Sequence, residues 1–390
     1  MNNISQYSNC YGCSVCQQVC PRNIIEIVEN NSGFYQPQIS KSDDCIDCGR
    51  CLKVCSMESP ILQTNDNVKG YASWSKEDAV RRKSSSGGTG FEIARHMVTH
   101  GYKVLGVRYN AEKQRAEHYI ASTVEELVQS MGSKYLQSFT AEAFKHINKC
   151  EKYLVTGTPC QIASIRKMLR LRNMEDNVVL MDFFCHGVPS KLMWDKYIQE
   201  LEREIGKVTY ASWRNKQSGW HDSWAIGLDG DKNGERIDWH ESYSILIREK
   251  KSFYTKKRSE GDLFYKFFLG DMCFNESCYK NCQFKSKSCA ADIRIGDLWG
   301  TAYEDNDEGV TGILSFTEKG DEILHKSNIY LKEEPINVVI EGQQSKRIKM
   351  PYYYNFLIKL LRSSLPLFLI YKIVQVLRIG TILKYKLHLK

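Results

Sequence analysis

The sequence predicts an α/β protein: a small α+β domain at the N-terminus, a mostly parallel sheet covered by helices, an antiparallel insertion and a helical C-terminal tail. Three observations support this prediction. Eight cysteines fall in two matching runs within the first 55 residues. Short apolar strands then alternate with helical segments to about residue 205. The last 46 residues contain ten Lys or Arg residues and no Asp or Glu.

Both cysteine runs have the spacing C-x2-C-x2-C-x3-C, and Pro21 follows the first. This spacing is typical of a ferredoxin-like domain with two 4Fe-4S clusters, in which the fourth cysteine of each run ligates the other cluster. We therefore assign one cluster to Cys10, Cys13, Cys16 and Cys55. We assign the other to Cys45, Cys48, Cys51 and Cys20.

Zinc and disulfides are the alternatives for these cysteines. Structural zinc sites use four ligands, usually in two separated pairs, so three cysteines within seven residues fit zinc poorly. Disulfides suit an oxidising compartment, but the polar start MNNISQYSNC lacks the features of a signal peptide. Since cluster ligands are thiolates, we expect a cytoplasmic protein. No apolar stretch of 18 residues appears, so we expect no membrane-spanning helix.

The net charge of +8 comes entirely from the tail. The rest of the chain has 44 basic and 46 acidic residues, a balance of −2. This distribution argues against a nucleic-acid partner. Basic, apolar and aromatic residues together in the tail suggest contact with an anionic inner membrane surface or with a partner groove. The alternative is a helical hairpin, broken near Pro366, that packs on the body.

We predict three domains. Residues 1–62 form the ferredoxin-like domain, with a short hairpin that turns at 31–33. Residues 63–345 form the second domain in two parts, 63–149 and 150–345, after a polar linker at 63–70. Residues 346–390 form the tail.

The second domain alternates helices and strands, which favours parallel pairing. We predict helices at 88–100, 123–131, 140–149, 161–172, 190–205 and 262–270, and strands at 103–108, 153–156, 178–184 and 292–295. Residues 206–240 contain four tryptophans among the hairpin signals Asp229-Gly230 and Asn233-Gly234, so we predict an antiparallel insertion there. The tryptophans are Trp213, Trp220, Trp224 and Trp239; they suit either strand packing or stacking on a planar ring.

Four later cysteines form a candidate third site. Cys160 and Cys185 each follow a predicted parallel strand, at the sheet edge where ligands bind in open α/β sheets. Cys278 and Cys282 lie close together in sequence, so we infer a third cluster held by these four residues. The alternative is a set of scattered buried thiols that act as small apolar groups.

A serine and glycine segment, 84–90, precedes the predicted helix at 88–100. The free N–H groups of a helix N-terminus suit phosphate oxygens, although an ordinary helix cap explains the same residues. No G-x-G-x-x-G follows a strand, so a standard nicotinamide site is not predicted. His186, beside Cys185, either orients a cofactor or caps a turn.

Five segments together resemble the family of the beta subunit of coenzyme F-420 hydrogenase/dehydrogenase. They are SSSGG at 84–88, GTPCQ at 157–161, CHGVPS at 185–190, CYKNC at 278–282 and DIRIGDLWG at 292–300. With the ferredoxin-like domain, the resemblance covers roughly residues 1–300. It departs from the family in CYKNC, where three residues rather than two separate the cysteines. This spacing leaves open whether Cys282, Cys289 or Cys273 completes the third cluster.

The resemblance implies an iron–sulfur flavoprotein with bound FAD near a cluster. The implied cofactor-binding residues are Ser85, Ser86, Gly87, Gly88, Gly157, Thr158, Pro159 and His186. The implied partners are a redox protein, either a ferredoxin or an oxidoreductase subunit, and a small hydride acceptor. That acceptor is a deazaflavin or an unsaturated metabolite, such as one from polysaccharide biosynthesis. The alternative function is an electron-transfer adaptor without flavin; catalytic residues are not predicted.

Overall fold

The computed structural model describes residues 2–64, 67–216, 219–232 and 253–388. Its N-terminal module contains the predicted hairpin, formed by β1 (Ile25–Glu29) and β2 (Tyr35–Ile39). Gly33 has a positive φ of 75° in the turn, a conformation that glycine adopts without strain. Two short helices, α1 (Val15–Gln18) and α2 (Arg50–Lys53), lie within the two cysteine runs.

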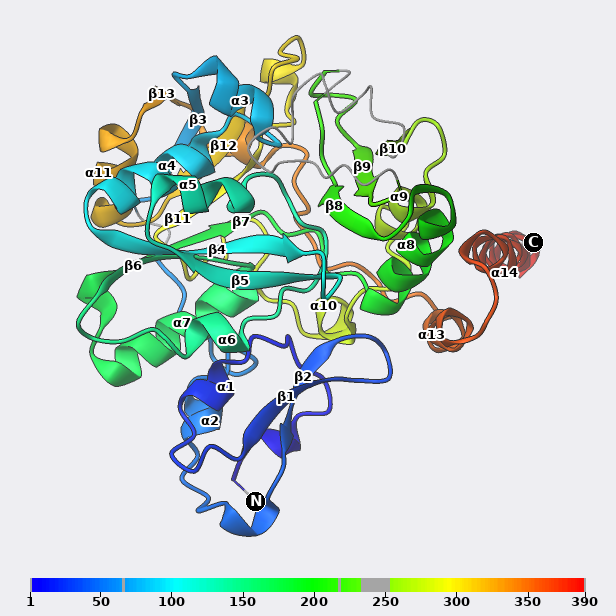
Figure 1. Cartoon of the computed structure of the whole chain (residues 1–390), viewed down its shortest axis with the longest axis horizontal. Helices are drawn as coiled ribbons and strands as arrows, with labels where there is room; N and C mark the ends of the chain where they lie inside the picture. Colours follow the sequence, from blue (N-terminus) through cyan, green and yellow to red (C-terminus); the bar gives the residue numbers. More distant parts are fainter. Residues whose placement is uncertain (1, 65–66, 217–218, 233–252, 389–390) are drawn as a thin grey trace.

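Eight strands form one large sheet in the order β13-β3-β12-β11-β7-β6-β4-β5 (Figure 1). The four central strands, β11, β7, β6 and β4, run parallel, and the flanking strands pair antiparallel. Their bounds are β3 Lys69–Ser75, β4 Tyr102–Asn110, β5 Arg115–Ala121, β6 Lys152–Thr156, β7 Val178–Phe183, β11 Ile293–Asp297, β12 Thr311–Ser315 and β13 Ile329–Glu333. The α/β class is confirmed, with the parallel pairing confined to the centre of the sheet.

Helices cover both faces of this sheet (Figure 1). On one face, α4 (Thr89–Thr99), α5 (Val124–Leu127) and α11 (Glu318–Lys326) contribute apolar side chains to one core. On the other face, α6 (Ala141–Phe144), α7 (Pro159–Arg172) and α12 (Ile336–Ile340) contribute to a second core. Val15, Val19 and Val54 of the N-terminal module join that second core, which fixes the module beneath α6 and α7.

The sequence and the structure differ in several elements. Strands β3, β5, β12 and β13 are not predicted, because they contain glycines or charged residues and depend on their sheet neighbours. The predicted linker at 63–70 overlaps β3, which begins at Lys69. The helices predicted at 123–131 and 140–149 are shorter: α5 passes into a 3-10 turn at Val128–Ser130, and α6 has one turn.

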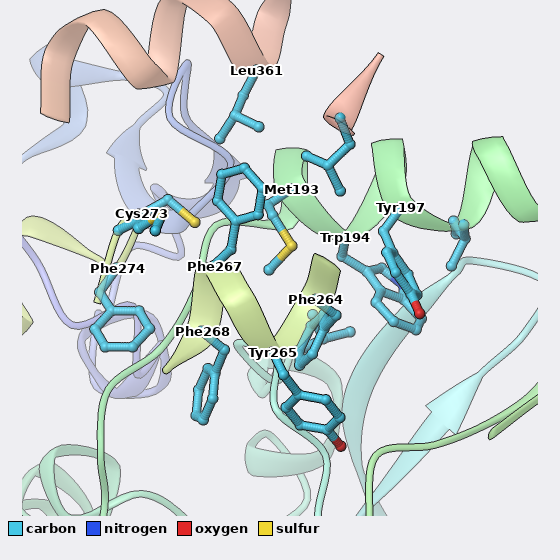
Figure 2. Close-up of a cluster of buried hydrophobic side chains, with 14 of the residues drawn as sticks. Met193, Trp194, Tyr197, Phe264, Tyr265, Phe267, Phe268, Cys273, Phe274 and Leu361 are labelled. Atoms are coloured by element: carbon cyan, nitrogen blue, oxygen red, sulfur yellow. The ribbon is translucent and has the colours of Figure 1, made fainter. Parts of the chain in front are cut away.

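The insertion is antiparallel, as predicted: β8 (Val208–Ser212), β9 (Ala225–Gly230) and β10 (Phe253–Lys257) pair in the order β10-β9-β8. The predictions for Trp239 and Asn233-Gly234 lie outside the described residues. The insertion packs on α8 (Lys191–Ile205) and α9 (Leu263–Phe268) around an aromatic core. Figure 2 shows this core and its residues Met193, Trp194, Tyr197, Phe264, Tyr265, Phe267, Phe268, Cys273, Phe274 and Leu361.

The tail forms a helical hairpin. Helix α13 (Tyr354–Arg362) and helix α14 (Leu367–His388) are separated by a turn that contains Pro366. Both helices pack against α8, and α14 also contacts α9. The predicted break near Pro366 and the packing on the body are therefore present. In the part of the chain that the structure describes, no helix has the length and apolar character needed to cross a membrane.

Candidate functional site

The first N-terminal cysteine group is built by two tight turns. Gly12 and Ser14 have positive φ values, and the Gly12 amide donates a 3.2 Å hydrogen bond to Cys10 Sγ. Burial is the main cause of the raised pKa of Cys16, and the charges of Cys13, Cys10 and Cys55 raise it further. Cys51 of the other run also contributes to this effect, so the two cysteine runs lie close together.

The second N-terminal group lines a cavity at the far end of the module. Its four cysteines, Cys20, Cys45, Cys48 and Cys51, share that lining with Asn3. The Asn3 side-chain amide donates a 3.4 Å hydrogen bond to Cys45 Sγ. Cys48 is solvent-exposed, whereas Cys13, Cys16 and Cys55 of the first group are buried. The second group is thus the one nearer to solvent.

A third group forms at the carboxyl edge of the parallel sheet. Cys160 is the second residue of α7, directly after β6, and Cys185 follows the neighbouring parallel strand β7. Helix α10 (Glu276–Lys280) contains Cys278, and Cys282 follows it. The amide of Ser190 donates to the carbonyl of Cys273, and the amide of Asn275 donates to Val188. These bonds hold α10 beside the loop that contains Cys185.

Electrostatic coupling joins all four cysteines of this third group. Burial is the main cause of the high pKa of the Cys160 thiol, and the charges of Cys185, Cys278 and Cys282 raise it further. Burial also raises the pKa of Cys185 to about 11 and that of Cys278 to about 12. Buried thiols with such pKa values need a bound cation to become thiolates. The group therefore fits an iron–sulfur cluster.

Cys273 and Cys289 have other surroundings. Cys273 is buried in the aromatic core, where Figure 2 also shows Phe267 and Phe274. Cys289 Sγ lies 3.4 Å from Asp182 Oδ2 and donates to it. Among the candidates for the fourth position, Cys282 is favoured, because its charge raises the pKa of both Cys160 and Cys185.

Zinc is the alternative to an iron–sulfur cluster at these cysteines. Among the residues described, no three Cys, His, Asp or Glu side chains meet closely enough to hold one metal ion. Four cysteines around a cage of four irons lie farther apart than four ligands of a single ion. The spacing of the two N-terminal cysteine runs favours clusters over zinc.

Direct contacts join the first N-terminal group to the third. The Ser56 hydroxyl donates a 3.0 Å hydrogen bond to the carbonyl of Cys160, and the Ser164 hydroxyl donates to Ser56. Tyr11 lies between the two groups: its hydroxyl donates a 2.7 Å hydrogen bond to the carbonyl of Asn281. The Tyr11 ring makes an edge contact with Phe284 at 6.0 Å. Hydrogen bonds and ring contacts thus join the surroundings of the two cysteine groups.

The segment at 84–88 packs against the neighbouring ends of strands β3 and β12. The Ser85 hydroxyl accepts a 2.8 Å hydrogen bond from the amide of Ser133, and the Ser86 hydroxyl donates to the carbonyl of Val310. The Gly87 amide donates to the Thr311 hydroxyl. A β-carbon at Gly87 would lie 2.4 Å from the carbonyl oxygen of Ser73, so only glycine fits there. These residues position the start of α4.

The start of α4 fits a phosphate group. Gly88 is the N-cap, with a φ of 88° and no side chain to bond the first amides of the helix. Uncapped amides at a helix N-terminus attract anions. The ammonium of Lys216 donates a 2.7 Å hydrogen bond to the carbonyl of Ser86. Burial is the main reason why the pKa of Lys216 is lowered to about 7.

Lys134 lies beside the same segment, and no sequence signal marks it or Lys216. Its ammonium donates to the carbonyls of Gln129, Met131 and Gly132. Burial lowers the pKa of Lys134 to about 7. An anionic ligand near a buried ammonium would offset the cost of burying its charge. The sequence does not predict Lys134 and Lys216 as candidate anion-binding residues. Their role depends on burial beside residues 84–88, which are distant from both in sequence.

The other predicted cofactor residues occupy the sheet edge. Gly157 follows β6, and Thr158 caps α7 with Pro159 as its first residue. Thr158 Oγ1 lies 3.2 Å from Cys160 Sγ. His186 Nε2 lies 2.7 Å from Asp271 Oδ1 and its ring contacts Phe268. The GTPCQ segment therefore contacts the third cysteine group directly, and His186 is held by Asp271.

Comparisons with known proteins bear on this site. Two family models described as "Coenzyme F420 hydrogenase/dehydrogenase, beta subunit" match the chain. The model of the N-terminal part matches residues 70–145, and the model of the C-terminal part matches residues 150–338. Together they cover about two thirds of the chain. Residues 9–59 match a 4Fe-4S dicluster domain. The predicted two-cluster domain is confirmed.

Among solved structures, one similar chain belongs to a xenon derivative of the F420-reducing NiFe hydrogenase complex from Methanosarcina barkeri. It is 16% identical to this chain, with a TM-score of 0.44. The match covers 77% of this chain and 88% of that chain. No curated protein matches this chain.

Proposed function

We propose that this chain, which belongs to the coenzyme F420 hydrogenase/dehydrogenase beta subunit family, is an iron–sulfur flavoprotein oxidoreductase. It relays electrons between a one-electron redox partner and a hydride-accepting substrate. The substrate is a deazaflavin coenzyme or an unsaturated metabolite. One observation carries the proposal: Cys160, Cys185, Cys278 and Cys282, distant in sequence, gather beside the N-terminal cysteine groups.

The order of the three cysteine groups supports a relay. The second N-terminal group, with exposed Cys48, is the entry point for a partner such as a ferredoxin or an oxidoreductase subunit. Cys13, Cys16 and Cys55 of the first N-terminal group are buried, and Ser56 and Tyr11 link this group to the third. Protein side chains here hold the groups at fixed positions and exclude water. Such placement is the contribution that a protein makes to cofactor chemistry.

FAD is the proposed cofactor at the start of α4. When bound, a flavin exchanges both single electrons and hydride, which joins cluster chemistry to hydride chemistry. The uncapped amides after Gly88 would bind a phosphate of FAD, and Lys134 and Lys216 would balance its charge. In the same domain, Trp220 of the insertion stacks on Trp299, which follows β11.

An anaerobic absorption spectrum with iron, sulfide and flavin analysis tests the proposal. We expect about twelve irons per chain, from three four-iron clusters, and one FAD. About eight irons would exclude the third cluster and leave the N-terminal domain intact. Intact clusters without FAD would favour the alternative of a non-catalytic electron-transfer adaptor. A colourless protein without acid-labile sulfide would favour zinc.

A cysteine variant separates the third cluster from the others. Cys160→Ser is expected to lower the iron content by about four per chain, because one ligand of a four-iron cluster is lost. Cys150→Ser is the matched control, since Cys150 is exposed and lies outside the three groups. Equal iron content in both variants would contradict the ligand assignment.

A lysine variant tests the flavin site. Lys134→Met is expected to weaken FAD binding by roughly tenfold, about 1.4 kcal/mol, because the variant loses the positive charge that would balance the phosphate. Lys145→Met is the control, since Lys145 is exposed and pairs with Glu142 on α6. Titration of flavin-free protein with FAD, followed by fluorescence, measures the affinity. Identical affinities for the two variants would remove Lys134 from the site.

A further inference from the structure

The C-terminal hairpin has an unusual outer face. Its apolar side chains remain exposed although its inner side is packed on the body. In the described part of the chain, half of the large exposed hydrophobic residues fall between 352 and 376. They are Tyr352 (63% exposed), Phe356 (47%), Phe368 (56%), Leu369 (37%) and Val376 (69%). Clustered exposed apolar residues mark an interaction surface.

The apolar residues on the inner side of the hairpin pack against the body of the protein. Leu357 and Leu361 of α13, with Leu367, Ile370 and Val374 of α14, are buried in the aromatic core. A helix at a protein surface ordinarily pairs such an apolar side with a polar outer side. The first turns of α14 have apolar residues on both sides, so packing on the body does not explain the outer ones.

The two helices present one continuous outer face. The Tyr352 hydroxyl, just before α13, donates a hydrogen bond to the carbonyl of Leu377 in α14. Val376, next to Leu377, therefore lies near Tyr352. On α14, Phe368, Lys372 and Val376 are four residues apart, a spacing that places side chains on one face of a helix.

The exposed charges on this hairpin have one sign. Lys359, Arg362, Lys372 and Arg378 are exposed, and residues 345–390 contain no Asp or Glu. Basic residues among exposed aromatic and aliphatic side chains complement a surface with an apolar layer beneath anionic headgroups. Interfaces between proteins commonly gain specificity from charges of both signs on each partner. The hairpin has no acidic residue, so this source of specificity for a protein partner is missing.

We propose that this outer face, defined by Tyr352, Phe356, Phe368, Leu369 and Val376 with Lys359, Arg362, Lys372 and Arg378, binds the surface of a membrane rich in anionic lipid. The proposal goes beyond the electron relay and does not depend on it. The apolar side chains enter the headgroup region, and the basic residues interact with lipid phosphates. The hairpin thus anchors the protein at the surface without a spanning helix.

Co-sedimentation of the full-length, cluster-loaded protein with vesicles tests this proposal. We expect binding to vesicles of equal parts phosphatidylcholine and phosphatidylglycerol, and little binding to phosphatidylcholine alone. High salt should weaken the binding, because it screens the basic residues. F356S/F368S/V376S should lower vesicle affinity on the order of tenfold or more. K359Q/R362Q/K372Q should lower it by a similar factor.

Two matched variants control for general surface effects. L62S/L171S/Y330S changes exposed apolar residues outside the tail, and K113Q/K149Q/K207Q changes exposed lysines outside it. Both should bind vesicles as the unmodified protein does. Retained absorption of the clusters checks that each variant is folded.

Equal binding to the two kinds of vesicle, or no loss in either tail variant, would overturn the proposal. A tail-dependent complex with one protein, in the absence of vesicle binding, would also overturn it and assign the face to a protein partner. Inorganic phosphate tests whether the basic residues bind phosphate ions in solution rather than a lipid surface. If it fails to displace the protein from vesicles, a site for free phosphate is excluded. Full displacement by phosphate at constant ionic strength would instead contradict a lipid surface.

Discussion

The Ser56 hydroxyl donates a 3.0 Å hydrogen bond to the main-chain carbonyl of Cys160, which lies 104 residues later in the sequence. Ser56 directly follows Cys55 of the first N-terminal group. Its amide also donates to the Ser164 hydroxyl, at 3.2 Å. Both serines are fully buried. The hydrogen bonds of Ser56 thus join the first cysteine group to helix α7, which contains Cys160 of the third group.

Ser56→Ala is expected to destabilise the protein by about 1–3 kcal/mol, since it leaves buried polar groups without partners. It should also alter the magnetic coupling between neighbouring reduced clusters, measured by electron paramagnetic resonance. Ser130→Ala is the control, because it removes a hydroxyl-to-carbonyl bond far from the cysteines. A stability loss with unchanged coupling would show that Ser56 does not set the cluster spacing.

Lys285 is predicted to raise the reduction potential of the proposed third cluster. Its ammonium donates to the carbonyls of Cys185 and His186, at 2.6 and 3.0 Å. Its positive charge also lowers the pKa of Cys185 and Cys278, opposing the larger effect of burial. A reduced cluster carries one more negative charge, so a nearby cation stabilises it.

Lys285→Met should lower the potential of the third cluster by roughly 40–90 mV, which corresponds to about 1–2 kcal/mol for one electron. Redox titration followed by electron paramagnetic resonance measures this shift. Lys280→Met is the control, because Lys280 is solvent-exposed and pairs with Glu276. Equal potentials in the two variants would contradict the prediction.

A buried ion pair stabilises the sheet beneath the third group. Arg294 on β11 and Asp182 on β7 are paired across the parallel strands, and both side chains are fully buried. Two hydrogen bonds of 2.7 Å join them. Arg294→Leu should cost about 3–5 kcal/mol of unfolding free energy, because it leaves the Asp182 carboxylate buried and unpaired.

The double variant Asp182→Leu with Arg294→Leu should recover part of that loss, since no charge then remains buried. Urea unfolding under anaerobic conditions measures both variants. If the double variant is less stable than Arg294→Leu alone, desolvation of Asp182 is not the cause of the effect.

His118 is predicted to make the protein sensitive to acid. Burial lowers the pKa of His118 to about 4, against the smaller effect of its hydrogen bond to the Thr156 carbonyl. Below pH 6.5 the unfolded chain binds a proton that the folded protein does not, so stability falls as the pH falls. From pH 7 to pH 5 the expected loss is about 2 kcal/mol.

His118→Gln should reduce this pH dependence by the same amount, whatever its effect on stability at pH 7. Urea midpoints of both proteins, measured at several pH values, provide the comparison. His146→Gln is the control, since His146 is exposed on the surface near α6. Parallel curves for His118→Gln and the unmodified protein would show that His118 does not cause the acid sensitivity.

Much of the candidate site could be predicted from sequence, because its chemistry lies in local spacing. The two cysteine runs predict the two-cluster domain, since each run curls around most of one cluster. Cys160 and Cys185 could be placed together because each follows a parallel strand. The sequence does not show whether Cys282, Cys289 or Cys273 is the fourth ligand. All three lie within residues 273–289, and their positions in space depend on how this segment folds.

Residue spacing and composition are enough to predict the two-cluster domain, the α/β class and the basic tail. The tertiary structure decided which cysteines meet, because the bonds between 188–190 and 273–275 bring α10 to Cys185. It also decided that four flanking strands pair antiparallel and that Lys134 and Lys216 are buried. These features depend on contacts between distant segments, whose energies appear only when the chain is folded.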